Sequence, residues 1–168
     1  YRAKAQPLAA RYAAERDMRR LPLTLPTGEE VRLSPGGQNP LVVAILREFC
    51  PRFTPGAVPV YIGDTAKKWA HFDEQLLARL GVNIADQHGK MPDVVVHHTA
   101  KNWLVLVEAV TSHGPMNAKR LIELRSLFAQ CKAGLVFVTA FPDRKTMVKY
   151  LGDIAWETEV WVAADPTH

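Results

Sequence analysis

Residues 91–110 of the chain read MPDVVVHHTAKNWLVLVEAV. Two apolar runs rich in β-branched residues flank the polar stretch 99–102, a composition typical of two strands joined by a short turn. An antiparallel hairpin centred on that turn pairs Val94 with Val107 and, one step further out, Asp93 with Glu108. Directly opposed residues share a face and hold their Cβ atoms about 5 Å apart. This stretch therefore predicts a hairpin that carries two neighbouring carboxylates.

Two carboxylates at that distance repel each other, and Glu108 ends a strand that is apolar on both faces. Burying an unpaired carboxylate costs several kcal/mol or keeps it protonated. A divalent cation relieves both penalties, and Mg²⁺ favours sites of one or two carboxylates completed by water and phosphate oxygens. We therefore expect Asp93 and Glu108 to be metal ligands. In the alternative interpretation, Asp93 caps a turn and Glu108 bonds to an arginine or a backbone donor.

The segments around this hairpin alternate between strand and helix patterns. The pattern predicts a strand over 58–62, a helix over 67–80 ended by Gly81, the hairpin strands 93–98 and 103–110, a helix over 117–131, a strand over 135–139, a helix over 143–151 and a strand over 160–163. Helices that alternate with strands around one hairpin indicate an α/β fold with a mixed β-sheet flanked by helices.

The N-terminal third precedes a proline-rich stretch at 53–59, which we take as the internal boundary. Residues 1–57 are expected to form an Ala/Arg-rich helix over 7–20, a hairpin of 21–25 with 30–33, and a helix from Asn39 that Pro51 ends. This segment would link to an upstream domain or support the core, which spans 58–168. The chain begins at Tyr1 without a Met, and we interpret it as a piece of a longer protein.

Composition excludes several classes of protein. Hydrophobic residues make up 48% and charged residues 23% of the 168 residues, a globular balance rather than a disordered one. No apolar run reaches the roughly 20 residues of a membrane helix. The formal net charge of +4 lies entirely within residues 1–20, because the remainder carries fifteen charges of each sign. Cys50 and Cys131 lack zinc-site spacing, so we expect reduced thiols and a cytoplasmic protein.

Longer sequence words carry a resemblance to a known family. They are YIGDTAK at 61–67, KMPDVV at 90–95, EAVTSHGP at 108–115, VTAFPDR at 138–144 and WETEVW at 156–161. In this order they resemble the C-terminal catalytic part of the BsuBI/PstI restriction endonucleases, within the PD-(D/E)XK nuclease superfamily. The resemblance implies a restriction-endonuclease-like core and a Mg²⁺-dependent type II enzyme. Such an enzyme cuts double-stranded DNA at a palindrome, typically CTGCAG, as a homodimer.

The chain departs from the nuclease pattern at one position. The motif lysine follows the glutamate by two residues, and Val110 stands there. On the 117–131 helix, Arg120 falls on the apolar side and Lys119 nearly opposite, so Arg120 is the better-placed replacement cation, with Lys119 as the alternative. The 67–80 helix in this nuclease class often supplies a further acid. The same helical phase favours Asp73 over Glu74 for it.

Three functions remain open from the sequence. The first is the nuclease, with Lys67, Lys68, Lys145 and His113 as candidates for contact with DNA phosphates. The second is a DNA-binding module whose nuclease site is degenerate, which the valine at position 110 favours. The third is an α/β interaction domain that does not bind nucleic acid, which the zero net charge of residues 21–168 allows.

Overall fold

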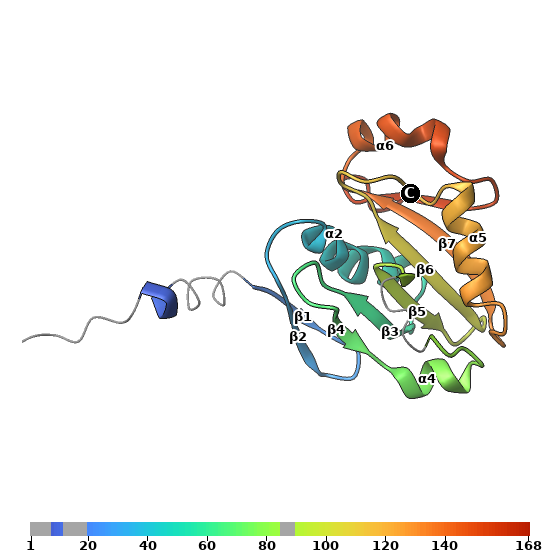
Figure 1. Ribbon diagram of the computed structural model, residues 1–168, viewed down its shortest axis with the longest axis horizontal. Helices are drawn as coiled ribbons and strands as arrows, with labels where there is room; N and C mark the ends of the chain where they lie inside the picture. Colours follow the sequence, from blue (N-terminus) through green and yellow to red (C-terminus); the bar gives the residue numbers. More distant parts are fainter. Residues whose placement is uncertain (1–7, 12–19, 85–89) are drawn as a thin grey trace, which may run out of the picture.

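The computed structural model describes residues 8–11, 20–84 and 90–168 (Figure 1). Its strands are β1 (Leu21–Thr24), β2 (Glu30–Leu33), β3 (Val58–Gly63), β4 (Trp69–Phe72), β5 (Val94–His98), β6 (Trp103–Ala109), β7 (Gly134–Phe141) and β8 (Glu159–Val162). Its helices are α2 (Asn39–Ala44), the π-helical turn η1 (Ile45–Phe49), α3 (Cys50–Phe53), α4 (Glu74–Arg79), α5 (Ala118–Leu127), α6 (Arg144–Tyr150) and the 3-10 turn η3 (Leu151–Asp153). The mixed α/β class predicted from the sequence is confirmed.

A six-stranded sheet in the order β4-β3-β5-β6-β7-β8 forms the centre of the molecule. Strands β4, β3, β5 and β6 pair antiparallel, whereas β6, β7 and β8 run parallel. The β5–β6 hairpin has the predicted register, with Val94 opposite Val107 and His98 opposite Trp103. The parallel strands are connected through α5 and α6, as parallel crossovers require. The central hairpin therefore joins the antiparallel and parallel halves of the sheet.

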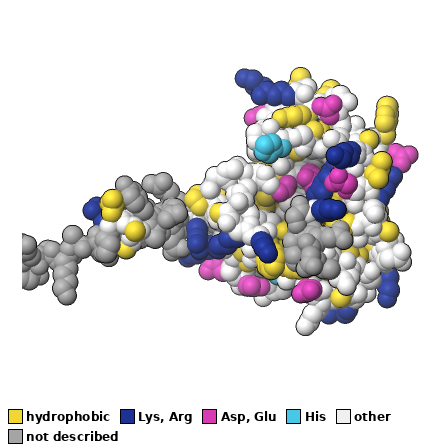
Figure 2. Space-filling model, in the orientation of Figure 1, with side chains coloured by type: hydrophobic (Ala, Val, Ile, Leu, Met, Phe, Trp, Pro, Cys, Tyr) yellow, Lys and Arg dark blue, Asp and Glu magenta, His cyan; other side chains and the backbone are white. Residues whose placement is uncertain are grey.

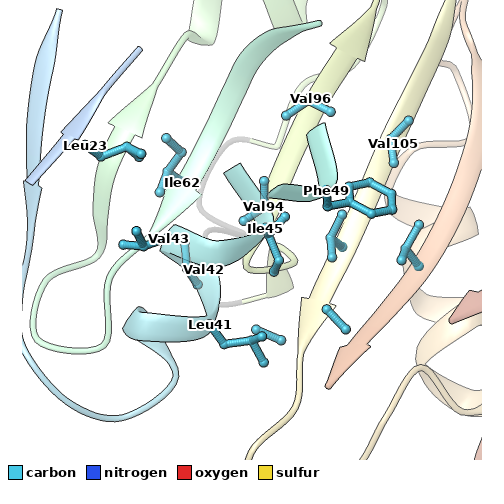
Figure 3. Close-up of a cluster of buried hydrophobic side chains, with 14 of the residues drawn as sticks. Leu23, Leu41, Val42, Val43, Ile45, Phe49, Ile62, Val94, Val96 and Val105 are labelled. Carbon is cyan, nitrogen blue, oxygen red and sulfur yellow. The ribbon is translucent and has the colours of Figure 1, made fainter. Parts of the chain in front are cut away.

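One face of the sheet is covered by the N-terminal segment. The separate β1–β2 hairpin and the α2–η1–α3 run pack there against alternate residues of β3, β5 and β6, and Figure 3 shows this cluster. Its labelled residues include Leu23, Val42, Ile45, Phe49, Ile62, Val94, Val96 and Val105. Burying side chains of this size stabilises a fold by about 1.5 to 3 kcal/mol each. The division at residue 57 stays a prediction, since residues on both sides of it share this core.

The other face of the sheet holds α4 and α5. Here Val95, Leu104 and Leu106 pack against Leu77 of α4 and Leu124 of α5. Side chains alternate along a strand, so Glu108 shares the face of Leu106 and points to the side that α5 covers. Asp93 lies just before the first residue of β5. A third, small cluster of Val110, Phe141 and Val162 lies at the α6 end of the sheet.

Two predicted boundaries were wrong. Pro51 does not end the helix that begins at Asn39, because the N–H of Cys50 bonds to the carbonyl of Ile45 in a wide π turn. Pro51, which has no N–H to donate, is accommodated directly after this turn, and the helix continues to Phe53. The predicted helix over 67–80 is divided between two elements. Trp69–Phe72 is a strand that pairs with β3, and within this range only Glu74–Arg79 is α-helical. An edge strand was therefore missed.

The predicted helix over 7–20 lies mostly outside the described residues, of which 8–11 are helical. Within the described part of the chain, no helix has the length and apolar character needed to cross a membrane. Cys50 and Cys131 are both free thiols.

Candidate active site

Asp93 lies directly before β5, where the chain enters the central hairpin. Its Oδ2 accepts a hydrogen bond from the N–H of Ala109 at 2.7 Å, which fastens it across the hairpin to the end of β6. Its Oδ1 accepts a hydrogen bond from Nε2 of Gln38, at the start of α2. Both carboxylate oxygens of Asp93 are therefore held by uncharged donors.

Glu108 lies at the end of β6 and is bound by a cation from the helix above it. Oε1 of Glu108 accepts hydrogen bonds from Nη2 of Arg120 at 2.7 Å and from Nε at 3.1 Å. The side chains of Glu108 and Arg120 are only 18% and 20% exposed. Nη1 of Arg120 also lies 3.5 Å from Oε2 of Glu123, one turn along α5. Glu108 is thus bonded to a cation, whereas the described hydrogen bonds of Asp93 come from uncharged donors and Arg120 acts on Asp93 through its charge.

The position of Arg120 in α5 is electrostatically unfavourable on its own. It is the third residue of the helix, where the macrodipole disfavours a cation. Asn117 caps this end, and its Oδ1 accepts from the N–H of Arg120 at 2.8 Å. The carboxylate of Glu108 offsets the dipole and fixes the guanidinium over the hairpin. On the surface bounded by α2, α5 and α6, Figure 2 shows acidic and basic side chains side by side.

Burial raises the pKa of both acids, and the charge of Glu108 adds to the shift of Asp93. Burial, and then the charge of Glu108, raise the pKa of Asp93 to about 7, although the donors from Ala109 and Gln38 oppose the shift. Burial also raises the pKa of Glu108, against the lowering effect of Arg120. Two neighbouring carboxyl groups whose pKa values are raised by burial are a place where added positive charge is stabilising.

Mg²⁺, the metal that the sequence predicts, needs few protein ligands. Within the described residues, no group of three or more His, Cys, Asp or Glu side chains is arranged to hold a metal ion. Mg²⁺ does not require one, since it keeps several water ligands and binds through one or two carboxylates together with substrate phosphates. The Asp93–Glu108 pair, with its surplus of buried negative charge, fits that requirement.

Val110 shows why the motif lysine has no place in this chain. Its side chain is 2% exposed and packs with Phe141 and Val162. Its N–H donates to the carbonyl of Ala140 at 2.9 Å, which continues the pairing of β6 with β7. A lysine here would bury an ammonium group in an apolar cluster. The positive charge at the acid pair instead comes from α5, through Arg120.

The structure places the other predicted residues as follows. Lys119 is exposed, so of the two candidate cations only Arg120 bonds to the acid pair. The sequence favoured Asp73 over Glu74 on the assumption of a helix over 67–80, but the helix begins only at Glu74. Asp73 is the N-cap of α4, where its Oδ1 accepts from the N–H of Leu76 at 3.0 Å. Among the described contacts, none joins Asp73 to Asp93 or Glu108.

Gln38 was missed by the sequence analysis. It lies 55 residues before Asp93, in a loop whose polar composition is ordinary, and no spacing rule connects the two. The available signal was the pair Gly36-Gly37 before it, which marks a tight turn where the backbone approaches another segment closely. Lys67, Lys68, Lys145 and His113 are exposed, and their contact with DNA stays a prediction.

Comparison with known proteins places this geometry in a family. The profile of the BsuBI/PstI restriction endonuclease domain matches residues 21–168. The chain belongs to the BsuBI/PstI restriction endonuclease family. The resemblance stated from the sequence words is thereby confirmed, and the acid pair lies within the matched region.

Relatives of this BsuBI/PstI family member are similar over its whole length. It is 50% identical over 168 residues to the type II restriction enzyme BsuBI of Bacillus subtilis, covering 53% of that enzyme. It is 33% identical over 170 residues to the type II restriction enzyme AplI of Arthrospira platensis, covering 97% of this chain and 52% of AplI. The structure of the SdaI restriction endonuclease matches with a TM-score of 0.85 at 47% identity, over 95% of this chain and 50% of SdaI. The fold is therefore restriction-endonuclease-like, and the chain spans about half the length of these relatives.

Proposed function

We propose that the protein is the catalytic part of a type II restriction endonuclease that hydrolyses double-stranded DNA with Mg²⁺. One observation carries the proposal: the hairpin holds Asp93 and Glu108 together with too little positive charge to balance them. Membership in a restriction endonuclease family supports the reaction class. The free thiols of Cys50 and Cys131 support a cytoplasmic location, where the DNA substrate also lies.

Each residue of the site has a distinct task in this proposal. Asp93 and Glu108 would hold the metal, which when bound polarises the scissile phosphate and lowers the pKa of a water. Arg120 cannot act as a base, because its guanidinium stays protonated. It offers several N–H donors, and those not bound to Glu108 can stabilise negative charge that develops on the phosphate. Hydrolysis then leaves a 5′-phosphate and a 3′-hydroxyl.

The substrate is proposed to be a palindrome, with CTGCAG as the site. A palindrome presents the same bases to two subunits related by a two-fold axis, so a homodimer would cut one strand with each subunit. Lys67, Lys68 and Lys145 would contact the phosphate backbone, which positions the protein without reading sequence. Asp73 and Lys119 are not given catalytic roles, since neither bonds to the acid pair.

A cleavage assay tests the proposal directly. A supercoiled plasmid with a single CTGCAG site is incubated with the 168-residue chain and Mg²⁺, beside the same plasmid with one base of the site changed. We expect a single linear product from the first plasmid and none from the second, and neither Asp93→Ala nor Glu108→Ala should cut. Uncut DNA after long incubation with Mg²⁺ and with Mn²⁺ would refute the activity. Cleavage of both plasmids would refute the assigned site.

The replacement of the motif lysine by Val110 favours a second candidate, a DNA-binding module that has lost cleavage. Cleavage by the wild type separates the two, once fluorescence anisotropy has shown that the wild type and Asp93→Ala both bind DNA. A binding module should retain DNA equally well in the wild type and in Asp93→Ala, and neither protein should cleave. The nuclease should bind DNA in both forms and cleave only as the wild type.

A further inference from the structure

The loop before α2 reaches the acid pair through an unusual pair of glycines. Gly36 and Gly37 have φ values of +87° and +58°, in the left-handed region that favours glycine. A Cβ on Gly37 would lie 3.1 Å from Cγ2 of Thr65, so the loop also presses closely on the segment after β3. The turn delivers the next residue, Gln38, to the carboxylate of Asp93.

Buried hydrogen bonds fix this loop to the end of β3. The carboxylate of Asp64 accepts from the N–H of Ser34 at 2.9 Å and from Nδ2 of Asn39 at 3.3 Å. Nδ2 of Asn39 also donates to the carbonyl of Ser34 at 2.8 Å, and its Oδ1 accepts from the N–H of Thr65 at 3.3 Å. Asp64 is 7% exposed and Asn39 is 1% exposed. These bonds hold Ser34 and Asn39, on either side of Gln38, against the buried Asp64 and the backbone of Thr65.

The same end of β3 also fixes Asp93. The N–H of Gly63 donates to the carbonyl of Asp93 at 2.8 Å, and a Cβ on Gly63 would lie 3.4 Å from that oxygen. Both partners of the bond between Gln38 and Asp93 are consequently held against one segment, 63–65. Their contact is part of a connected network rather than an encounter of two surface side chains.

We propose that Gln38 is a positioning residue, which fixes the carboxylate of Asp93 in the orientation that binds the metal. The inference rests on the proposed function, because it takes Asp93 as a metal ligand. With the N–H of Ala109 on Oδ2 and the amide of Gln38 on Oδ1, the plane of the carboxylate is set at both ends. Each oxygen keeps a lone pair for the cation.

The neutral amide suits this task better than a charged group. A lysine or arginine at position 38 would neutralise the charge that the metal needs. A carboxylate there would add to the repulsion within the pair. Partners that orient a metal ligand in this way are worth about 10- to 100-fold in metal affinity or activity. Gln38 is half-buried and contributes little to the core, so its loss should affect the metal far more than the fold.

The experiment compares Gln38→Ala and the similarly sized Gln38→Met with wild type. Gln75→Ala, on the exposed side of α4, is the matched control. The readout is the rise in melting temperature as Mg²⁺ is titrated into metal-free protein, since a bound ion stabilises the folded state by mass action. The second readout is the Mg²⁺ concentration that gives half-maximal DNA cleavage.

We expect both Gln38 variants to melt near the wild type in EDTA and to need about 10-fold more Mg²⁺ or more in both readouts. At saturating Mg²⁺ their cleavage rates should approach that of the wild type, and Gln75→Ala should match the wild type throughout. Wild-type metal dependence in Gln38→Met would overturn the inference, provided that Asp93→Ala no longer responds to Mg²⁺. A normal Mg²⁺ response in Asp93→Ala would instead overturn the metal site itself, and with it the proposed function.

Discussion

Replacing Asp93 by asparagine should make the metal-free protein more stable at alkaline pH. In the folded protein the pKa of Asp93 is about 7, against an ordinary value of 3.8, because the carboxyl group is buried beside Glu108. Between these two values the folded state holds a proton that the unfolded state has released. The free energy of unfolding therefore falls as pH rises from about 4 to about 7, and ionised Asp93 destabilises the fold above that range.

The size of the stability difference between Asp93→Asn and the wild type follows from the pH interval between 5 and the folded pKa of Asp93. From pH 5 to a folded pKa of about 7 is about two units, and each unit is worth 1.36 kcal/mol. The stability of Asp93→Asn relative to the wild type should thus increase by about 2 to 3 kcal/mol between pH 5 and pH 8. For a domain of this size that corresponds to about 5 to 10 °C in melting temperature.

Thermal unfolding in EDTA at several pH values, followed by circular dichroism, measures this difference. Asp153→Asn, which alters an exposed carboxylate, is the control and should track the wild type. Adding Mg²⁺ at pH 8 should stabilise the wild type and leave Asp93→Asn unchanged. If the gap between Asp93→Asn and the wild type is the same at pH 5 and pH 8, then Asp93 is not the destabilised acid that this reasoning requires.

Further predictions concern four single side chains. Arg120→Ala should lower the cleavage rate at saturating Mg²⁺ by about 10²-fold or more, and Arg120→Lys should recover part of it, since one ammonium cannot replace a bidentate fork. Lys119→Ala should cut normally, and the reverse pattern in single-turnover assays would assign the cation to Lys119. Asp73→Ala should lower the unfolding free energy by about 1 kcal/mol through loss of the α4 cap, with a normal cleavage rate. Val110→Lys should not raise the cleavage rate and should destabilise the protein by several kcal/mol in urea unfolding, because the position is buried in the apolar cluster around Phe141.

The central hairpin could be predicted because its geometry is local. A short polar turn between two apolar runs sets the register, and alternation then decides which residues share a face. Val94 and Val107 pair as the sequence predicts, and Asp93 and Glu108 are the residues that flank this pair. The cation was predictable for a similar reason, since the phase of one regular helix separates Arg120 from Lys119.

The edge strand β4 could not be predicted in this way. Trp69 and Phe72 are three residues apart, which is the spacing of a helical stripe and not of one face of a strand. Their pairing with β3 decides the outcome, and that contact is tertiary. The helical phase assigned to Asp73 was wrong as a consequence, because a residue just outside a helix caps it instead of projecting from its face. The prediction that Pro51 ends the helix was wrong because a π turn before it lets the helix continue, and local propensity does not predict such a turn.

The two acids of the site have different hydrogen-bond partners, and this difference bears on where a cation binds. Glu108 bonds to the positive charge of Arg120, whereas the hydrogen bonds that the structure describes for Asp93 come from an amide and a backbone N–H. The uncompensated charge therefore concentrates on Asp93, which is where an incoming cation gains most. In the usual motif a lysine two residues after the glutamate would stand on the same strand as the acid. Here Val110 is packed among apolar side chains and the positive charge comes from α5, so the site depends on how helix and hairpin are packed together.

Substitutions in the α5–β6 interface, such as Leu121→Ala, should on this reasoning reduce cleavage beyond their effect on stability, because they displace Arg120 from Glu108.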